Sequence, residues 1–151
     1  MKKVGVAKMK IKIRYCGSPE LQSTTAGDWI DLYTSRDVDL NAGEFTRIPL
    51  GVAMELPKGI EANIVPRSST FERYGLLQTN SYGIVDNAYC GDTDEWQMPV
   101  YATRATFVPK GTRLCQFRLN PTMSKVFGEI AFESVITLGN VARGGFGSTG
   151  K

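Results

Sequence analysis

The chain has 151 residues, of which 42% are hydrophobic and 22% charged, and its formal net charge at neutral pH is +3. These values are typical of one globular domain, and no apolar run is long enough to predict a membrane-spanning helix. The first ten residues, MKKVGVAKMK, are too charged for a secretory signal. We therefore expect no membrane partner and a cytoplasmic location, meaning the host cytoplasm if a phage encodes the protein.

Histidine does not occur in the sequence. Its absence excludes Ser-His-Asp and Cys-His nucleophiles and every His-ligated metal site. A general base would have to be a carboxylate or, less often, Lys, Tyr or Cys. A bound metal would be a hard ion such as Mg2+ with oxygen ligands. Cys16, Cys90 and Cys115 are far apart and lack C-x-x-C spacing, so we expect buried or half-buried free thiols.

Taken in chain order, the sequence predicts strands and turns. Residues 8–15, KMKIKIRY, alternate polar and apolar and predict an edge strand with lysines on its solvent face. A basic surface that contacts nucleic acid or other polyanions is the alternative. Two longer β-rich segments follow at 44–67 and 96–119, each interrupted by a Pro-Lys-Gly turn, at Pro57 and at Pro109. The repeated turn hints at a duplicated hairpin.

A single segment, residues 69–76 (STFERYGL), could form a helical turn or two, and a connecting loop is the alternative. Many short strands with Gly/Pro turns and no alternation of strands with helices predict an all-β sandwich, jelly roll or small barrel. An oligonucleotide-binding barrel is not favoured, because a groove of interleaved basic and aromatic residues is not evident. We therefore expect no nucleic-acid partner.

Four stretches contain more polar and charged residues than the structure of a β-sandwich requires. They are AGDWIDLYT (26–34), PRSST (66–70), NSYGIVDNAYCGD (80–92) and GTRLCQFRL (111–119). Each also has a purely structural explanation. Asp31 could be a turn residue, Ser68 or Ser69 could cap a helix, and Gln116 could be a solvent-facing strand residue.

Asp86 is the most suggestive single residue. It lies between Gly83-Ile84-Val85 and Asn87-Ala88-Tyr89, where a glycine-bearing hairpin would hold its carboxylate beside an aromatic ring. The sequence also ends in GGFGSTGK, and residues 145–151 read G-x-x-x-x-G-K, a phosphate-binding pattern without its final Ser/Thr. A P-loop requires a helix after this pattern. Because glycine-rich segments are costly to order alone, we expect a flexible arm that contacts phosphates instead.

In this order, the four stretches and the tail resemble the five motifs of the homotrimeric dUTP pyrophosphatases (dUTPases). The longer GDWIDL, the PRSST and the LGN before the tail resemble the phage and prophage branch. The resemblance implies a jelly-roll-like β-clip fold with at most one short helix. It also implies a single domain over residues 1–138, a flexible arm over 139–151, and a homotrimer with shared active sites.

The resemblance implies a dUTP diphosphatase, which hydrolyses dUTP to dUMP and pyrophosphate by Mg2+-assisted attack of water on the α-phosphorus. Such an enzyme limits uracil incorporation into DNA and supplies dUMP for dTMP synthesis. Asp86 resembles the catalytic carboxylate that polarises the water, and Tyr89 resembles the tyrosine that packs against deoxyribose and excludes a 2'-hydroxyl. The residues implied in uracil recognition are Asn80, Gly83, Ile84 and Val85.

The resemblance assigns the phosphates to the other motifs. Arg67 and Ser68 would hold the triphosphate, with Ser69 beside them where the family commonly has glycine. Gln116 would contact the α-phosphate and the water shell of the metal. Asp31 would act on Mg2+ indirectly, through water, and no direct protein ligand is expected. The arm residues implied to close over the nucleotide are Arg143, Phe146, Gly147, Ser148 and Thr149.

Several alternatives stay open. Motif one is two residues longer than usual, so Asp28 competes with Asp31, and Arg143 lies two residues nearer the glycines than in the family. The acidic insert 91–96, GDTDEW, is either a solvated turn or, with the basic amino-terminal segment, a place where a regulatory protein partner binds. A dCTP deaminase-like enzyme and a nucleotide-gated regulatory binding protein are the other candidate functions. Asp86 and Tyr89 argue against the deaminase.

Overall fold

The structure of the protein, a computed structural model, describes residues 8–22 and 27–147. These residues form eleven short strands and two short helices. In chain order the elements are β1 Lys12–Tyr15, β2 Ile30–Tyr33, β3 Val38–Leu40, β4 Phe45–Pro49, β5 Val52–Glu55, β6 Ile60–Pro66, α1 Thr70–Tyr74, β7 Leu76–Gln78, β8 Gly83–Val85, β9 Gln97–Ala102, β10 Thr106–Val108, β11 Arg113–Pro121 and α2 Met123–Phe127.

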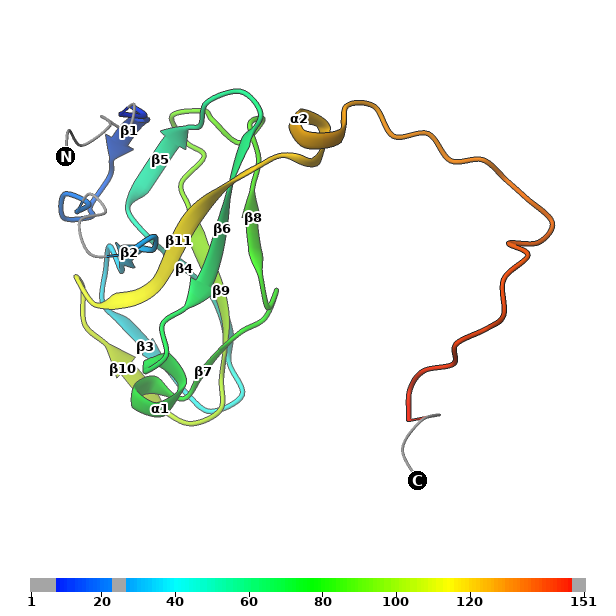
Figure 1. Ribbon diagram of the computed structural model, residues 1–151. Helices are drawn as coiled ribbons and strands as arrows, with labels where there is room; N and C mark the ends of the chain where they lie inside the picture. The colour runs from blue at the N-terminus through cyan, green and yellow to red at the C-terminus, as the bar shows by residue number, and fades with distance from the viewer. Residues whose placement is uncertain (1–7, 23–26, 148–151) are drawn as a thin grey trace, which may run out of the picture.

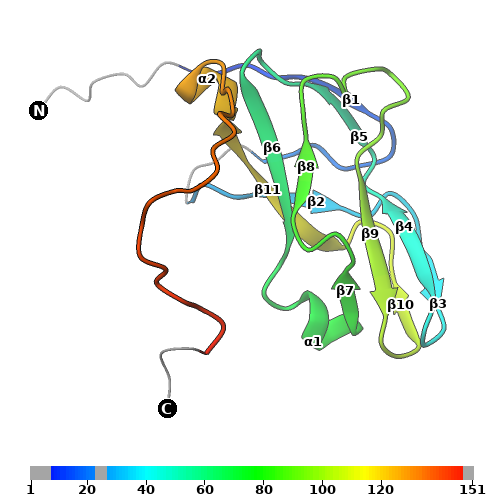
Figure 2. The ribbon, with the colours of Figure 1, turned by 90° about the vertical axis from the view of Figure 1, so that its right-hand side faces the viewer.

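The strands pair in antiparallel fashion into four sheets. A four-stranded sheet has the order β2-β11-β6-β8, a three-stranded sheet has the order β4-β9-β7, and two small sheets are β1-β5 and β10-β3. The two larger sheets face each other as two layers (Figures 1 and 2). The predicted all-β architecture is confirmed, although it includes two short helices where at most one was expected.

The core lies between these layers and follows from alternation along the strands. On β9, Met98, Val100 and Ala102 are buried while the residues between them point outward. A strand turns successive side chains to opposite faces, so this period of two gives each sheet one apolar face. Trp96 and Phe117 join the layers, with their rings edge to face and the centroids 5.1 Å apart.

The second helix begins and ends at residues suited to those positions. The side chain of Thr122 accepts a hydrogen bond from the Lys125 N–H, which caps the helix N-terminus. Gly128, with φ of 70°, ends the helix. The chain then continues through residues 129–147 away from the sheets, with every side chain exposed (Figure 1).

The two Pro-Lys-Gly turns have the expected local structure but do not form hairpins. In each turn the proline carbonyl accepts an N–H from three residues further on, and Gly59 and Gly111 have positive φ values of 77° and 81°. However, β5 pairs with β1, and β6 pairs with β11 and β8. The strands on either side of the second turn, β10 and β11, also lie in different sheets. The prediction of a duplicated hairpin is therefore wrong.

The amino-terminal strand and two of the three cysteines follow the predictions. Lys12 lies on the exposed face of β1 and pairs with Glu55 at 3.0 Å, as expected for an edge strand that carries lysines. Cys115 is buried and Cys16 half-buried, as predicted, but Cys90 is exposed, so the prediction is wrong for this thiol. Burial raises the pKa of Cys115, which makes this thiol unreactive.

Candidate active site

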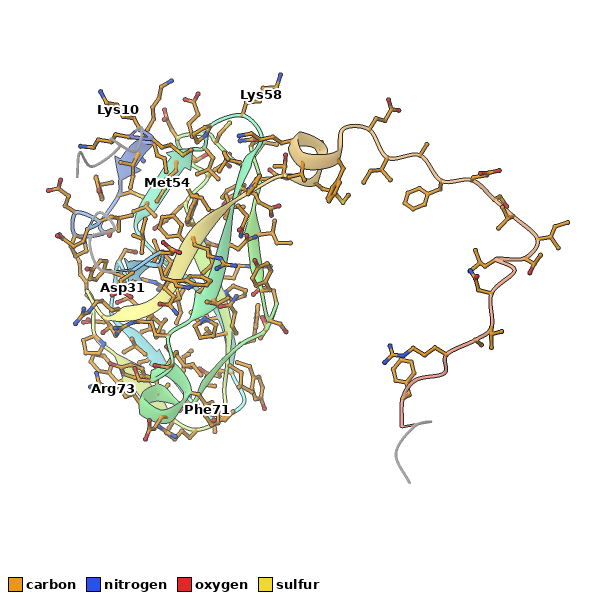
Figure 3. The ribbon with its side chains drawn as sticks, viewed as in Figure 1. Lys10, Asp31, Met54, Lys58, Phe71 and Arg73 are labelled. Atoms are coloured by element: carbon orange, nitrogen blue, oxygen red, sulfur yellow. The ribbon has the colours of Figure 1, made fainter. Side chains whose placement is uncertain are left out.

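Two half-buried residues, Asp31 and Arg67, and an exposed Arg113 form a cluster on the outer face of the four-stranded sheet. Asp31 on β2 pairs through Oδ1 with Arg67 Nε at 3.0 Å and through Oδ2 with Arg113 Nη1 at 3.6 Å. Figure 3 labels Asp31 on this sheet. Asp28 is exposed in the loop before β2, so of the two motif-one aspartates it is Asp31 that lies in the cluster.

The strand register brings Gln116 into the same cluster. In the antiparallel pairs, Gln116 on β11 lies opposite Asp31 on β2 and opposite Val65 on β6. Directly opposite residues point to the same face of a sheet. Arg67 follows two residues after Val65, at the end of β6. Three residues predicted from three separate stretches therefore lie together.

Arg113 belongs to this cluster and was not predicted. In a regular strand, residues three apart point to opposite faces, so Arg113 should face away from Gln116. A β-bulge between Arg113 and Cys115 adds one residue and returns Arg113 to the face of Asp31. Only its location inside the polar stretch 111–119 could have indicated Arg113 from the sequence. The sequence contains no recognisable signal for the bulge.

The loop after β6 is held by a buried threonine. The Thr70 hydroxyl donates to the Leu114 carbonyl at 2.6 Å and accepts the Arg67 N–H at 3.1 Å. Ser68 is exposed, and Ser69 occupies the N-cap position of α1 without a side-chain capping bond. The expectation that a serine side chain caps this helix is therefore wrong for Ser69. Both serines follow Arg67 directly in the sequence, and the Arg67 guanidinium is paired with Asp31.

The donor chemistry of this cluster can be tested against Mg2+. Both carboxylate oxygens of Asp31 face guanidinium groups, which compete with direct coordination of a cation. Contact through a water molecule fits this arrangement, and so does an ion held mainly by the phosphates of a nucleotide. No three His, Cys, Asp or Glu side chains gather as a metal site within the described ranges.

Asp86 lies at the end of β8, exposed, and its carboxylate is oriented by the backbone that follows. Oδ1 accepts the N–H groups of Ala88 at 2.9 Å and Tyr89 at 3.2 Å. The Tyr89 hydroxyl donates to the Glu95 carbonyl at 2.8 Å. Partial burial, and then the carboxylates of Asp94 and Glu95, raise the pKa of Tyr89, so its hydroxyl stays protonated and able to donate.

The acidic insert 91–96 is attached to the body at its second half. Gly91 to Thr93 are exposed, as in a solvated turn. Glu95, in contrast, accepts the Gly51 N–H at 2.9 Å, and Trp96 is buried in the core. The insert therefore connects Tyr89, through the Glu95 carbonyl, to the body of the protein, and a purely solvated turn is the wrong description.

The segment predicted to read a base begins with a tight turn. Ser81, with φ of 57°, adopts the left-handed conformation that costs a non-glycine residue about 1 kcal/mol. Gly83 lies so close to β6 that a Cβ there would be 3.0 Å from Cβ of Ile64. Asn80 and Ile84 are exposed. The expected hairpin over 80–86 is wrong, because β7 pairs with β9 while β8 pairs with β6.

The two groups of candidate residues lie apart within one chain. On β6, Val65 is the neighbour of Gln116, whereas Ala62 is the neighbour of Val85, the residue before Asp86. At about 3.3 Å per residue along a strand and about 4.8 Å between strands, Asp86 lies roughly 15–20 Å from the Asp31 cluster. That distance is too long for a hydrogen bond or a single bridging water.

The arm residues are also distant from both groups. Arg143, Phe146 and Gly147 are exposed on the extended segment that leaves the body (Figures 1 and 3). Ser148 and Thr149 lie outside the described residues. Within residues 8–22 and 27–147, no helix is long and apolar enough to cross a membrane.

Two arginines beside a carboxylate on one face of an all-β fold define a class of protein that can bind a phosphate-bearing ligand. Residues 19–150 match the sequence profile of the family described as dUTPase, and the chain therefore belongs to the dUTPase family. The predicted family is confirmed.

Named relatives span nearly the whole chain. The SPbeta prophage-derived deoxyuridine 5'-triphosphate nucleotidohydrolase of Bacillus subtilis strain 168 is 49% identical over 144 residues, covering 94% of this chain and 99% of the relative. The deoxyuridine 5'-triphosphate nucleotidohydrolase of Anaeromyxobacter sp. is 32% identical over 152 residues, covering 93% and 97%.

Solved structures share the fold. A point mutant of the Staphylococcus bacteriophage 80alpha dUTPase with dUpNHpp has a TM-score of 0.74 at 16% identity, covering 95% of this chain and 100% of that one. A point mutant of the dUTPase from phage phi11 of S. aureus, described for the coordination of a structural Mg(II) ion, has a TM-score of 0.71 at 14% identity. It covers 86% of this chain and 99% of its own.

Proposed function

We propose that the protein is a dUTP diphosphatase, which hydrolyses dUTP to dUMP and pyrophosphate with Mg2+. The observation that carries this conclusion is its 49% identity, over almost the full length of both chains, to a deoxyuridine 5'-triphosphate nucleotidohydrolase. The chemistry of the chain agrees, because a protein without histidine needs a carboxylate base and Asp86 is exposed and oriented.

Each group of residues has a defined task in this reaction. Asp86 accepts a proton from the attacking water with the oxygen that is not bonded to Ala88 and Tyr89. Arg67 uses Nε for Asp31, which leaves its terminal nitrogens to form a fork with phosphate oxygens. Gln116 donates to the α-phosphate, and Ser68 and Ser69 add hydroxyl donors. Mg2+ bound with the triphosphate neutralises its charge.

Base and sugar are read by the segment around β8. Backbone groups of Gly83 to Val85, with the Asn80 amide, match the O4 acceptor and N3–H donor of uracil. Cytosine reverses these two groups and would leave buried polar groups unpaired. The Tyr89 ring, held by its bond to Glu95, would pack against the deoxyribose and leave no room for a 2'-hydroxyl.

A complete site requires residues from more than one copy of the chain, and we place the protein in a homotrimer. Two features support this arrangement: the separation of roughly 15–20 Å between Asp86 and the Asp31 cluster, and an extended arm that is exposed along its whole described length. One copy would supply Asp86 and Tyr89, a second Asp31, Arg67 and Gln116, and a third the arm with Arg143 and Phe146. Closure of the arm, with Ser148 and Thr149, would exclude water.

We keep residues 1–138 as the domain and 139–151 as the arm. The protein acts in the cytoplasm, in the host cytoplasm if it is encoded by a phage, which is supported by the prophage-derived relative.

The activity is tested by incubating the full chain with Mg2+ and, separately, dUTP, dCTP, dTTP or UTP. We expect pyrophosphate release from dUTP to exceed that from dCTP by about 1000-fold or more, because cytosine reverses the donor and the acceptor that the backbone edge would pair. Release from UTP and dTTP should also be much slower, since UTP carries a 2'-hydroxyl that Tyr89 would exclude and dTTP carries a C5 methyl group that uracil lacks. Ammonia release from dCTP is measured in parallel. An inert dUTP sample together with ammonia from dCTP would establish the deaminase instead.

The shared site is tested with two inactive variants, Asp86→Asn and Arg67→Ala, which are unfolded, mixed and refolded together. If one site draws Asp86 and Arg67 from different chains, mixed trimers contain intact sites, and activity should return to about a quarter of the wild-type value. Each variant refolded alone is the control. If the mixture stays as inactive as the two controls, each chain supplies both residues to its own site.

A further inference from the structure

Asn87, the residue after Asp86, binds a turn that is distant in sequence. Its Nδ2 donates to the carbonyl oxygens of Leu56 at 3.1 Å and Pro57 at 2.9 Å, and its Oδ1 accepts the Gly59 N–H at 3.1 Å. The side chain thus uses both its donor and its acceptor function on three backbone groups of one turn. Asn87 is half-buried, so water competes weakly for these bonds.

The turn at residues 56–59 is also fixed on its other side. The Thr122 N–H donates to the Gly59 carbonyl at 2.9 Å, just before α2 begins. A Cβ on Gly59 would lie 2.8 Å from Cδ of Lys125, so glycine lets α2 pack this closely. Lys58, at the tip of the turn, is labelled near α2 in Figure 3. The turn therefore connects Asn87 with the helix from which the arm leaves.

The backbone around Asp86 depends on the contact between the Asn87 side chain and the turn at 56–59. Residues 86–95 belong to neither a strand nor a helix, and the ladder of backbone bonds to the body resumes at Trp96, which donates its N–H to the Val52 carbonyl and accepts the Leu50 N–H. The Asp86 carboxylate takes its orientation from the N–H groups of Ala88 and Tyr89. Those donors keep their place only if the segment is itself fixed to the body, and Asn87 makes its three bonds to the body within this stretch.

We propose that Asn87 is a positioning residue, which holds the Asp86 carboxylate in place by fixing residues 86–89 to the turn at 56–59 and so to α2. The proposal rests on the proposed function for the role of Asp86. A general base must stay within hydrogen-bond reach of the attacking water, and a displacement on the order of 1 Å can cost about 100-fold in rate. Asn87 acts through Asp86 and needs no contact with the nucleotide.

Three variants of the full chain test this role. Asn87→Ala removes all three bonds. Asn87→Asp keeps the size and the acceptor for Gly59 but loses both donors and places a carboxylate against two carbonyl oxygens. Asn41→Ala is the control, because the Asn41 side chain also donates through Nδ2, at 3.0 Å to the Glu44 carboxylate, in a turn before β4 outside the candidate site. The bond of 3.1 Å from the Asn41 backbone N–H to Glu44 remains in this variant.

The first measurement is amide hydrogen exchange at Ala88 and Tyr89 in the free protein, which does not depend on activity. We expect exchange about tenfold faster in both Asn87 variants and unchanged in Asn41→Ala. The second measurement is steady-state kinetics with dUTP and Mg2+, well below each variant's unfolding temperature. We expect kcat to fall about 10- to 100-fold in the Asn87 variants, with KM within about threefold of wild type.

Faster exchange together with a lower kcat supports the proposal. Unchanged exchange overturns it, and so does faster exchange with an unchanged kcat, which is the result that a merely stabilising side chain would give. A wild-type chain that leaves dUTP intact would defeat the proposed function instead. In that case, faster exchange still supports Asn87 as the residue that orders Asp86, and unchanged exchange still overturns it.

Discussion

Asp86→Asn is expected to lower kcat for dUTP hydrolysis by about three orders of magnitude while nucleotide binding changes little. The amide has nearly the size of the carboxylate and can still accept the N–H groups of Ala88 and Tyr89. It cannot accept a proton from water, and a positioned general base contributes about 100- to 10,000-fold. Single-turnover pyrophosphate release gives the rate, and calorimetric titration with dUpNHpp gives the affinity.

The matched control for this variant is Asp92→Asn. Asp92 is an exposed aspartate in the nearby insert, and it contacts Arg14 through its backbone carbonyl, which accepts a bond from the guanidinium. Its conversion removes the same charge without touching the proposed base, and kcat should stay within about twofold. Wild-type turnover by Asp86→Asn would remove Asp86 from the mechanism.

Ending the chain after Asn140 is the second change with a large expected effect. The truncated protein should keep its thermal unfolding temperature and its assembly, because residues 141–147 are exposed and make no hydrogen bond to the body. Its kcat/KM for dUTP should fall about 100-fold or more, since closure over the nucleotide positions the reacting groups. Calorimetry, sedimentation and steady-state kinetics measure the three quantities.

Two point variants within the arm distinguish the loss of uracil stacking by Phe146 from the mere removal of arm residues. Phe146 and Val141 are both fully exposed apolar residues. Phe146→Ala removes the ring expected to stack over uracil and should account for about tenfold of the loss, whereas Val141→Ala should behave as wild type. Full activity of the truncated protein would refute the closing arm, and equal effects of the two point variants would refute stacking by Phe146.

Local conformation was predictable from sequence because it depends on neighbouring residues. The alternation in residues 8–15 identified an edge strand, and the glycines of the two Pro-Lys-Gly turns have the positive φ that such turns need. The same turns were misassigned as hairpins. Which strand pairs with which is decided by packing of the whole core, and a turn sequence alone cannot report that its two strands enter different sheets.

In the candidate site too, features that depend on neighbouring residues were predictable from the sequence, and features that depend on distant residues were not. Asp86 is predicted as the base because the absence of histidine leaves a carboxylate as the favoured base and because glycine and tyrosine flank this residue. Arg113 was missed because a bulge, which has no clear sequence signal, turns it to the face of Asp31. The attachment of the insert through Glu95 and Trp96 was missed for a related reason, since both contacts are to residues distant in sequence.

By itself, the sequence determined the all-β class and the family, and it predicted a carboxylate as the general base. These properties follow from alternation, composition and ordered motifs, which are local. The tertiary structure alone decided which side chains converge on one sheet face: Asp31, Arg67, Arg113 and Gln116. It also placed Asp86 away from them, after β8 and beside the first residues of β6. Register between strands far apart in the chain sets these separations, because each strand pairs where its apolar face completes the core.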